Sequence, residues 1–177
     1  MLTLQSKIAD PKSVAAAAIA AQLILPYELR EKSRLLATLN TGEEAAVFTA
    51  RGSVMRDGDL MLGNDGRIVQ IIAAAEPTYK VECSSVFELL RCAFHLGNRH
   101  TQAQVGDGFL RIRLDPVLKD MLHGLGASAL EELSPFEPEA GAYGGGHPHG
   151  DDAHPHNPLA PIPLRQRIHR PSDVAET

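Results

Sequence analysis

The sequence predicts an α+β protein, with a small N-terminal β domain, a ferredoxin-like βαββαβ domain and a flexible C-terminal tail rich in His, Pro and Gly. Short apolar runs separated by Gly-containing turns fill residues 22–75, a pattern typical of small β domains. Strand and helix patterns then alternate up to residue 133. Seven of the twelve Pro and five of the eight His lie after residue 136. We therefore expect domains at residues 1–76 and 77–136, and a disordered tail at residues 137–177.

The composition is that of a folded protein in reducing surroundings. The chain has 177 residues, of which 44% are hydrophobic, and a formal net charge of −5. This apolar fraction excludes a fully disordered chain. Two Cys cannot build a disulfide framework, so we expect a cytoplasmic protein. The acidic balance and the lack of a basic stripe argue against a nucleic-acid partner.

The one long apolar run, at residues 14–25, is too short to span a bilayer, and we expect no membrane partner. Asp10 before it and the bulky residues at its end disfavour a secretory signal. We interpret the run as a short Ala-rich helix that leads into a strand at residues 22–25.

The rest of the N-terminal region predicts strands joined by tight turns. Gly tolerates the positive φ that such turns require, so a Gly pair between apolar runs indicates a hairpin. The region contains no recognisable catalytic motif. The predicted strands are residues 34–39, 44–50, 59–62 and 67–73, and the turns are Thr41-Gly42, Asp57-Gly58 and Asp65-Gly66.

Residues 79–97 predict a strand followed by a helix. Ser85 and Glu88 have the spacing of a capping box, in which the two side chains satisfy the free amides of a helix start. We expect Gly97 to end the helix as a left-handed cap. The apolar face of this helix is predicted at helical spacing, at Val86, Leu89, Leu90, Ala93 and Leu96.

Two strands, a second helix and a last strand complete the pattern. Alternation predicts strands at residues 101–105 and 109–114, and Asp115 followed by Pro116 predicts a helix start. A strand at residues 127–133 completes the order β-α-β-β-α-β of the split βαβ fold. We expect the open face of this sheet to be a partner or dimer surface. The second helix is predicted to bury Val117, Leu118, Met121, Leu122 and Leu125.

The tail contains two pairs of His separated by Pro. Its seven Pro, five Gly and single aromatic residue bury too little apolar area to offset the entropy of ordering. Neutral imidazole is a common ligand of nickel, copper and zinc, and a His-biased segment is typical of metal binding. The alternative is a low-complexity tail with incidental His. The candidate ligands are His147, His149, His154 and His156.

His100 is the second candidate ligand. Spacing alone favours a solvent-exposed residue on the polar face of a strand. A functional role requires the open sheet face to be a dimer face, because a twofold axis would bring two copies of His100 together around one metal. Two imidazoles leave coordination positions open, which suits a carrier of labile metal.

Cys83, Cys92 and His95 form the third candidate group. Cys92 and His95 are i, i+3 neighbours on the first helix, so a thiolate–imidazole pair is conceivable. We favour a buried Cys that acts as a small core residue, because nothing in the sequence lowers its pKa. The sequence contains no phosphate-loop, nucleophile-elbow or zinc-protease motif, so we predict no catalytic residue.

Five stretches of the sequence together resemble a known family. They are HLGNRH at residues 95–100, DPVLKDML at 115–122, PFEPEAGAYGGGHPHG at 135–150, LREKSR at 29–34 and RGSVMRDGDLML at 51–62. On these residues the chain resembles UreE-type urease accessory proteins, the nickel metallochaperones of urease assembly. The resemblance extends from residue 22 to residue 150.

The resemblance implies a non-enzymatic homodimer with a peptide-binding-like N-terminal domain and a metal-binding, dimerising C-terminal domain. His100, the last residue of GNRH, would meet its copy at the dimer interface as a ligand of Ni²⁺, with Cu²⁺ or Zn²⁺ also bound in vitro. His147 and His149, then His154 and His156, would add ligands. Nickel would pass to the urease apoprotein pre-activation complex, with its GTPase accessory protein as immediate partner.

The sequence departs from the family in one place and leaves alternatives open. Some members carry a further His cluster before the second helix, where this chain has Arg113, Leu114 and Pro116. One alternative function is a general copper, zinc or nickel buffer whose tail holds the metal. Others are an enzyme that uses Cys92 with His95, and an interaction module that binds no metal.

Overall fold

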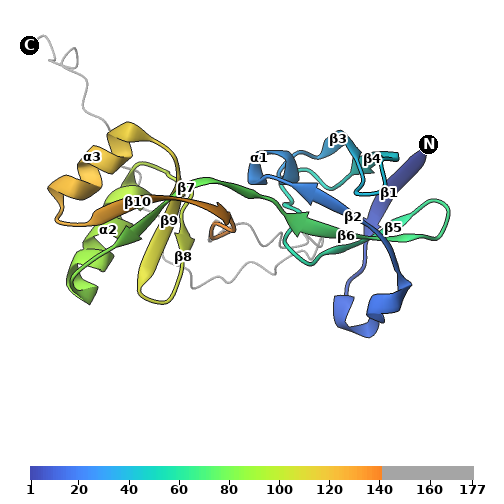
Figure 1. Cartoon of the computed structure of the whole chain (residues 1–177), viewed down its shortest axis with the longest axis horizontal. Coiled ribbons are helices and arrows are strands. Elements are labelled where there is room, and N and C mark those ends of the chain that lie inside the picture. The colour runs from blue at the N-terminus through green and yellow to red at the C-terminus, as the bar shows by residue number, and fades with distance from the viewer. Residues whose placement is uncertain (141–177) are drawn as a thin grey trace, which may run out of the picture. The chain divides into compact units, whose positions relative to one another are not determined.

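A computed structural model describes residues 1–140, and the remaining residues, 141–177, lie outside the description. The described chain forms two sheets (Figure 1), one of six strands and one of four. Each sheet has its own apolar core. This confirms the predicted α+β class. None of the helices within residues 1–140 has the length and hydropathy needed to cross a membrane.

The N-terminal sheet has the strand order β2-β6-β5-β1-β4-β3. β1 pairs with β4 and β2 pairs with β6 in parallel, and the other neighbours are antiparallel. The strands β3 to β6 confirm the four strand predictions between residues 34 and 73. The six strands are β1 Leu2–Lys7, β2 Ile19–Leu25, β3 Arg34–Thr38, β4 Glu44–Phe48, β5 Leu60–Gly63 and β6 Ile68–Ala73.

Two predicted hairpin turns are present in this sheet. Gly42 lies between β3 and β4 with φ of 86°, and Gly66 lies between β5 and β6 with φ of 83°. An L-residue with a side chain rarely adopts such angles, so glycine at these positions is what lets each pair of strands reverse direction.

The predicted strand at residues 22–25 is confirmed as part of β2, but the Ala-rich helix predicted before it is wrong. Only two single turns of 3-10 helix, η1 Pro11–Ser13 and η2 Ala16–Ala18, precede a strand that begins at Ile19. Ala21, Leu23 and Leu25 alternate into the core, and the strand pairs with β6. Burial and pairing in the sheet outweigh the modest helix preference of alanine.

The first strand was not predicted from the sequence. β1 lies inside the sheet between β4 and β5, and Leu2 and Leu4 are buried in its core. The local pattern is short, and its partners lie about 40 to 60 positions away, so the strand is defined by tertiary pairing.

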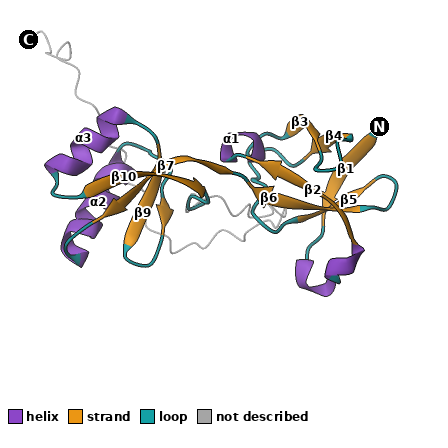
Figure 2. Ribbon diagram, in the orientation of Figure 1, coloured by secondary structure: helices purple, strands orange, loops and turns teal. Residues whose placement is uncertain are grey.

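The C-terminal unit has the sheet order β10-β7-β9-β8, with every pair antiparallel (Figure 2). Together with its two helices this confirms the predicted βαββαβ order. The elements are β7 Ala75–Glu82, α2 Val86–Asn98, β8 Gln104–Val105, β9 Phe109–Arg113, α3 Pro116–Gly124 and β10 Ser128–Pro135, and a short α1 Tyr27–Arg30 belongs to the N-terminal unit.

Both long helices begin as predicted. The Ser85 hydroxyl accepts a hydrogen bond from the Glu88 amide at 3.2 Å, while the Glu88 carboxylate accepts from the amide and hydroxyl of Ser84. At α3 the Asp115 carboxylate accepts from the amides of Val117 and Leu118. These bonds satisfy amides that the first turn leaves free.

The predicted apolar face of α2 is only partly correct. Cys92 and Leu96 are buried, and Leu89 and Ala93 pack against the same core. The other predicted positions point outward, where with two Phe they form a second apolar face that we call the α2 outer face. It consists of Val86 (73% exposed), Phe87 (69%), Leu90 (64%) and Phe94 (63%).

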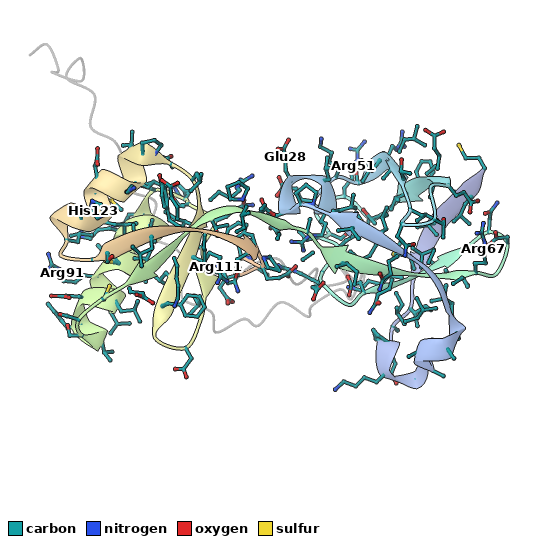
Figure 3. All side chains as sticks on the ribbon, in the orientation of Figure 1. Glu28, Arg51, Arg67, Arg91, Arg111 and His123 are labelled. Carbon is teal, nitrogen blue, oxygen red and sulfur yellow. The ribbon has the colours of Figure 1, made fainter. Side chains whose placement is uncertain are left out.

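The open face of the C-terminal sheet is mostly polar and internally paired. Lys80 forms an ion pair with Glu82, and Arg111 forms one with Glu132, each at 2.6 Å. Both cations also lie over the Phe109 ring, and Figure 3 labels Arg111 on this sheet. This composition argues against the expectation from the sequence that the open face is a partner or dimer surface.

Candidate metal centre

His100 lies just beyond the C-terminus of α2, not on a strand as the sequence predicted. Its amide donates to the Gly97 carbonyl at 2.9 Å, and the Thr101 amide donates to the Leu96 carbonyl at 3.1 Å. These two bonds are the Schellman motif, which ends a helix with a left-handed residue. Gly97 therefore lies inside α2, and the left-handed cap is His100.

The backbone of His100 is strained. With φ of 53° it is the one non-glycine residue with positive φ among residues 1–140. The left-handed region costs a residue with a side chain about 1 kcal/mol, and glycine usually occupies this position. The His100 side chain is exposed, so core packing does not explain why an imidazole is present. A strained, exposed, metal-competent residue is typical of a functional site.

His100 lines two surface cavities. One, of about 640 Å³, is also lined by Glu139 and Ala140, and the other, of about 650 Å³, by Arg113 and Asp115. No three His, Cys, Asp or Glu side chains gather into a metal-binding group anywhere in residues 1–140. Within residues 1–140, His100 is therefore not part of a group of three or more potential metal ligands.

The start of the tail is held close to the residues that follow His100. The Glu139 amide donates to the Ala103 carbonyl at 2.9 Å, and the Glu137 amide donates to the Gln104 side chain at 3.0 Å. The chain thus leaves the described region beside β8. The tail candidates, His147, His149, His154 and His156, lie outside the described residues.

A buried arginine anchors the same segment. Arg30 has no exposed surface and donates to the carbonyls of Leu25, Met55 and Phe136 and to the Glu137 carboxylate. The ring of Phe136, also buried, lies edge-on to Tyr27 at 5.4 Å. Another arginine, Arg56, donates to Glu137 at 3.1 Å.

The sequence pattern did not predict this anchor. Arg30 and Glu137 are 107 positions apart, and no local pattern relates them. Arg30 lies in LREKSR and Glu137 lies in PFEPEAG, and the family resemblance rests on both stretches. Their presence in such stretches is the feature of the sequence that relates the two residues.

The structure contradicts a thiol nucleophile at Cys92. The side chain is fully buried, and burial, followed by a hydrogen bond with Cys83, raises the pKa of its thiol to about 11. Such a thiol is protonated at neutral pH and closed to substrate. Nearby His95 packs edge-on against Phe94 at 5.5 Å, and His123 lies exposed on α3 (Figure 3).

These features define a class of protein: a two-sheet α+β protein with an exposed, metal-competent histidine at the end of a helix. Comparison with known proteins identifies the family. The N-terminal domain of the UreE urease accessory protein family matches residues 3–74, and the C-terminal domain of that family matches residues 76–160. The chain therefore belongs to the UreE family of urease accessory proteins, and it is an accessory chaperone, not an enzyme.

Similar proteins cover nearly the whole chain. A urease accessory protein UreE of Janthinobacterium sp. is 66% identical over 176 residues, which are 99% of this chain and 100% of that protein. The corresponding protein of Nitrosospira multiformis is 59% identical over 98% of both chains. One from Burkholderia lata is 51% identical over 86% of this chain and 75% of its own length. These relatives confirm the resemblance drawn from the sequence.

Proposed function

We propose that the protein is a nickel metallochaperone that delivers Ni²⁺ to apo-urease. Its labile site is formed by His100 of two protomers, and the tail histidines His147, His149, His154 and His156 supplement it. The observation that carries the proposal is His100 itself, exposed and left-handed at the end of α2. Membership of the urease accessory protein family points to urease as the recipient of the metal. The resemblance to nickel metallochaperones points to Ni²⁺ as the metal.

The chemistry of the donors suits transfer of the metal. Neutral imidazole binds borderline cations such as Ni²⁺, and two imidazoles leave several coordination positions for water or a recipient protein. Copper binds such ligands more tightly than nickel, so binding of Cu²⁺ in vitro is compatible with the proposal. Protons compete with metal for imidazole, so binding weakens below about pH 6.

The proposed homodimer pairs through the α2 outer face. A group of neighbouring exposed apolar side chains, such as this one, is typical of a protein interface. The face runs along the helix whose end carries His100. A twofold axis that passes near that end of α2 would bring the two copies of His100 together. The ion pairs of the open sheet face argue against that face, which the sequence had favoured.

The tail histidines are within reach of His100. Ala140 lines the same cavity as His100. His147 follows seven positions later, a span of at most about 25 Å when extended. His147 and His149 can therefore act as additional ligands of the same ion, and His154 and His156 act from farther along the tail.

The resemblance supplies the proposed partners, which are the urease apoprotein complex and its GTPase accessory protein. The low Cys content supports a place in the cytoplasm. Composition and periodicity support three parts, at residues 1–76, 77–136 and 137–177.

Calorimetric titration with Ni²⁺ tests the proposal. We compare the wild type, His100→Ala, a chain truncated after Tyr143, and His123→Ala as the control for loss of an exposed histidine. We expect one tight nickel per dimer in the wild type and in His123→Ala. That site is lost in His100→Ala, and the truncated chain keeps a weakened version of it.

The same titration separates this proposal from a general metal buffer. A buffer would hold its metal in the tail, so the truncated chain would lose all binding and His100→Ala would behave as the wild type. A nickel isotherm of His100→Ala that overlays the wild type rules out the site at His100.

A further inference from the structure

We propose that Cys83 and Cys92 form a reversible intramolecular disulfide when a hydroperoxide oxidises the protein. Their sulfur atoms lie 3.9 Å apart. Cys83 follows directly after β7, and Cys92 lies in the second turn of α2, so both are held against one core. In residues 1–140 no third donor joins the two sulfurs as a metal ligand. Oxidation of the pair is thus the chemistry that its surroundings favour.

The sulfur atoms are already close to bonding distance. A disulfide bond is about 2.0 Å long, so the gap to close is about 2 Å. Cys83 lies in the short connection between the strand and the helix, where a side-chain rotation and a small backbone shift can bring the sulfurs together. Cys92 can remain in its place in the core.

The surroundings give the two thiols different roles. Cys83 is partly exposed, whereas Cys92 is buried. Burial and the hydrogen bond with Cys83 also keep the pKa of Cys92 high. A small oxidant in solvent therefore meets Cys83 first, and Cys92 is the resolving thiol, because its proximity to Cys83 compensates for its low thiolate fraction.

The reaction balances with hydrogen peroxide as the oxidant. The Cys83 thiolate attacks one peroxide oxygen, the O–O bond breaks, and the other oxygen leaves as water after it takes a proton. Cys83 is then a sulfenic acid. The Cys92 sulfur gives up its proton and attacks the Cys83 sulfur, so the S–S bond forms, the S–O bond breaks, and the hydroxyl leaves as a second water. A dithiol reductant reverses the oxidation.

The disulfide would fasten the first half of α2 to the end of β7. It closes a ring from residue 83 to residue 92 and thereby restricts opening of that part of the helix. This consequence concerns the helix alone and does not depend on nickel binding.

Peptide mapping of the full-length protein tests the proposal directly. Trypsin cleaves after Lys80, Arg91 and Arg99, so Cys83 and Cys92 fall in different peptides, residues 81–91 and 92–99. The reduced protein is treated with a small excess of hydrogen peroxide at neutral pH, alkylated and digested. We expect the two peptides joined, about 2 Da below their summed mass, and released by dithiothreitol. Alkylation of both thiols at the untreated level, or linkage between chains only, overturns the proposal.

Two variants test the order of events. In Cys92→Ala, which keeps a small apolar side chain in the core, dimedone should label Cys83 after peroxide treatment. In Cys83→Ser, Cys92 should stay reduced at the same dose. Labelling of Cys92 in place of Cys83 contradicts the assigned roles. The wild-type mapping needs neither variant, so it decides the main question even if one of them folds poorly.

Discussion

The amide of Thr101 donates to the carbonyl of Leu96 at 3.1 Å, and this bond holds His100 between them at φ of 53°. The helix end therefore requires a left-handed residue at the position where the proposed nickel ligand lies. Stability and metal binding make opposite demands on that residue, because glycine fits the backbone and only histidine supplies the imidazole.

His100→Gly should consequently stabilise the protein while it removes the tight nickel site. We expect a gain of about 0.5–1 kcal/mol in the free energy of unfolding, since relief of strain is partly offset by the greater freedom of glycine in the unfolded chain. Urea unfolding of the metal-free protein measures it. His100→Ala is the matched control, because it loses the imidazole and retains the strain. A glycine variant less stable than the alanine variant would contradict this reading of the helix end.

The α2 outer face should control dimerisation. Leu90→Glu and Phe94→Glu place a charge where apolar side chains would meet, so each should shift the protein toward monomer. Both side chains are more than 60% exposed in a single chain, so the fold itself should survive. Sedimentation velocity at micromolar concentration measures the change.

Leu130→Lys is the control for that experiment. Leu130 is 53% exposed on the open face of the C-terminal sheet, where it lies opposite Lys80. We expect this variant to remain dimeric. If Leu130→Lys dissociates the dimer and the α2 variants do not, the open sheet face is the interface, as the sequence suggested.

Glu137→Gln should weaken the anchor of the tail. The change leaves the buried guanidinium of Arg30 without its counter-charge. We expect a loss of about 2 kcal/mol, less than for a fully buried pair because the Glu137 side chain is 25% exposed. Chemical denaturation measures the loss, and nickel titration should show a smaller contribution from the tail.

Glu139→Gln serves as the comparison. Glu139 is exposed, and its contact with Ala103 uses the backbone amide, which the substitution preserves. Its stability should stay within about 0.5 kcal/mol of the wild type. Equal losses in the two variants would mean that the Arg30 ion pair has no special role.

Arg67 should make the stability of the N-terminal sheet depend on pH in the acid range. Hydrogen bonds from Arg67 lower the pKa of Glu43 below 4.5 and that of Asp65 below 3.8, their ordinary values (Figure 3 labels Arg67). Because both folded-state pKa values are lowered, the stabilisation is present above about pH 4.5 and is lost as the pH falls through the folded values.

Melting temperatures measured from pH 6 to pH 3 check this dependence. In Arg67→Met the decline between pH 4.5 and pH 3 should be shallower than in the wild type. All three side chains are solvent-exposed, so the difference should be small and should shrink in high salt. Arg51→Met, which removes another arginine in an exposed turn, should follow the wild type. If the melting temperature declines equally with pH in all three proteins, Arg67 is not the cause of the pH dependence.

Local features of the fold were predictable from the sequence. The hairpin turn at Gly42, the helix cap at Asp115 and the alternation that buries Leu110 and Ile112 each depend on a few neighbouring residues. The order β-α-β-β-α-β follows from such signals. The candidate site was predictable to the extent that His100 belongs to a recognisable motif.

Features that depend on distant partners were decided by the tertiary structure. The strand at Ile19 replaces a helix because it pairs with β6, and Arg30 becomes an anchor because Glu137 reaches it from 107 positions away. The outward direction of Leu90 follows from which side of α2 the sheet covers. A sequence pattern shows which positions are apolar, and it does not show which of two apolar faces is buried.

His100 combines both kinds of information. The sequence alone shows that residue 100 is a histidine, which can bind a metal, and the resemblance selects it from eight histidines. Its left-handed backbone is set by two hydrogen bonds to Leu96 and Gly97, which form only when α2 continues past Gly97 and the chain turns toward β8. The reason is physical: a side chain carries its chemistry wherever it lies, whereas a backbone conformation exists only in the structure that holds it.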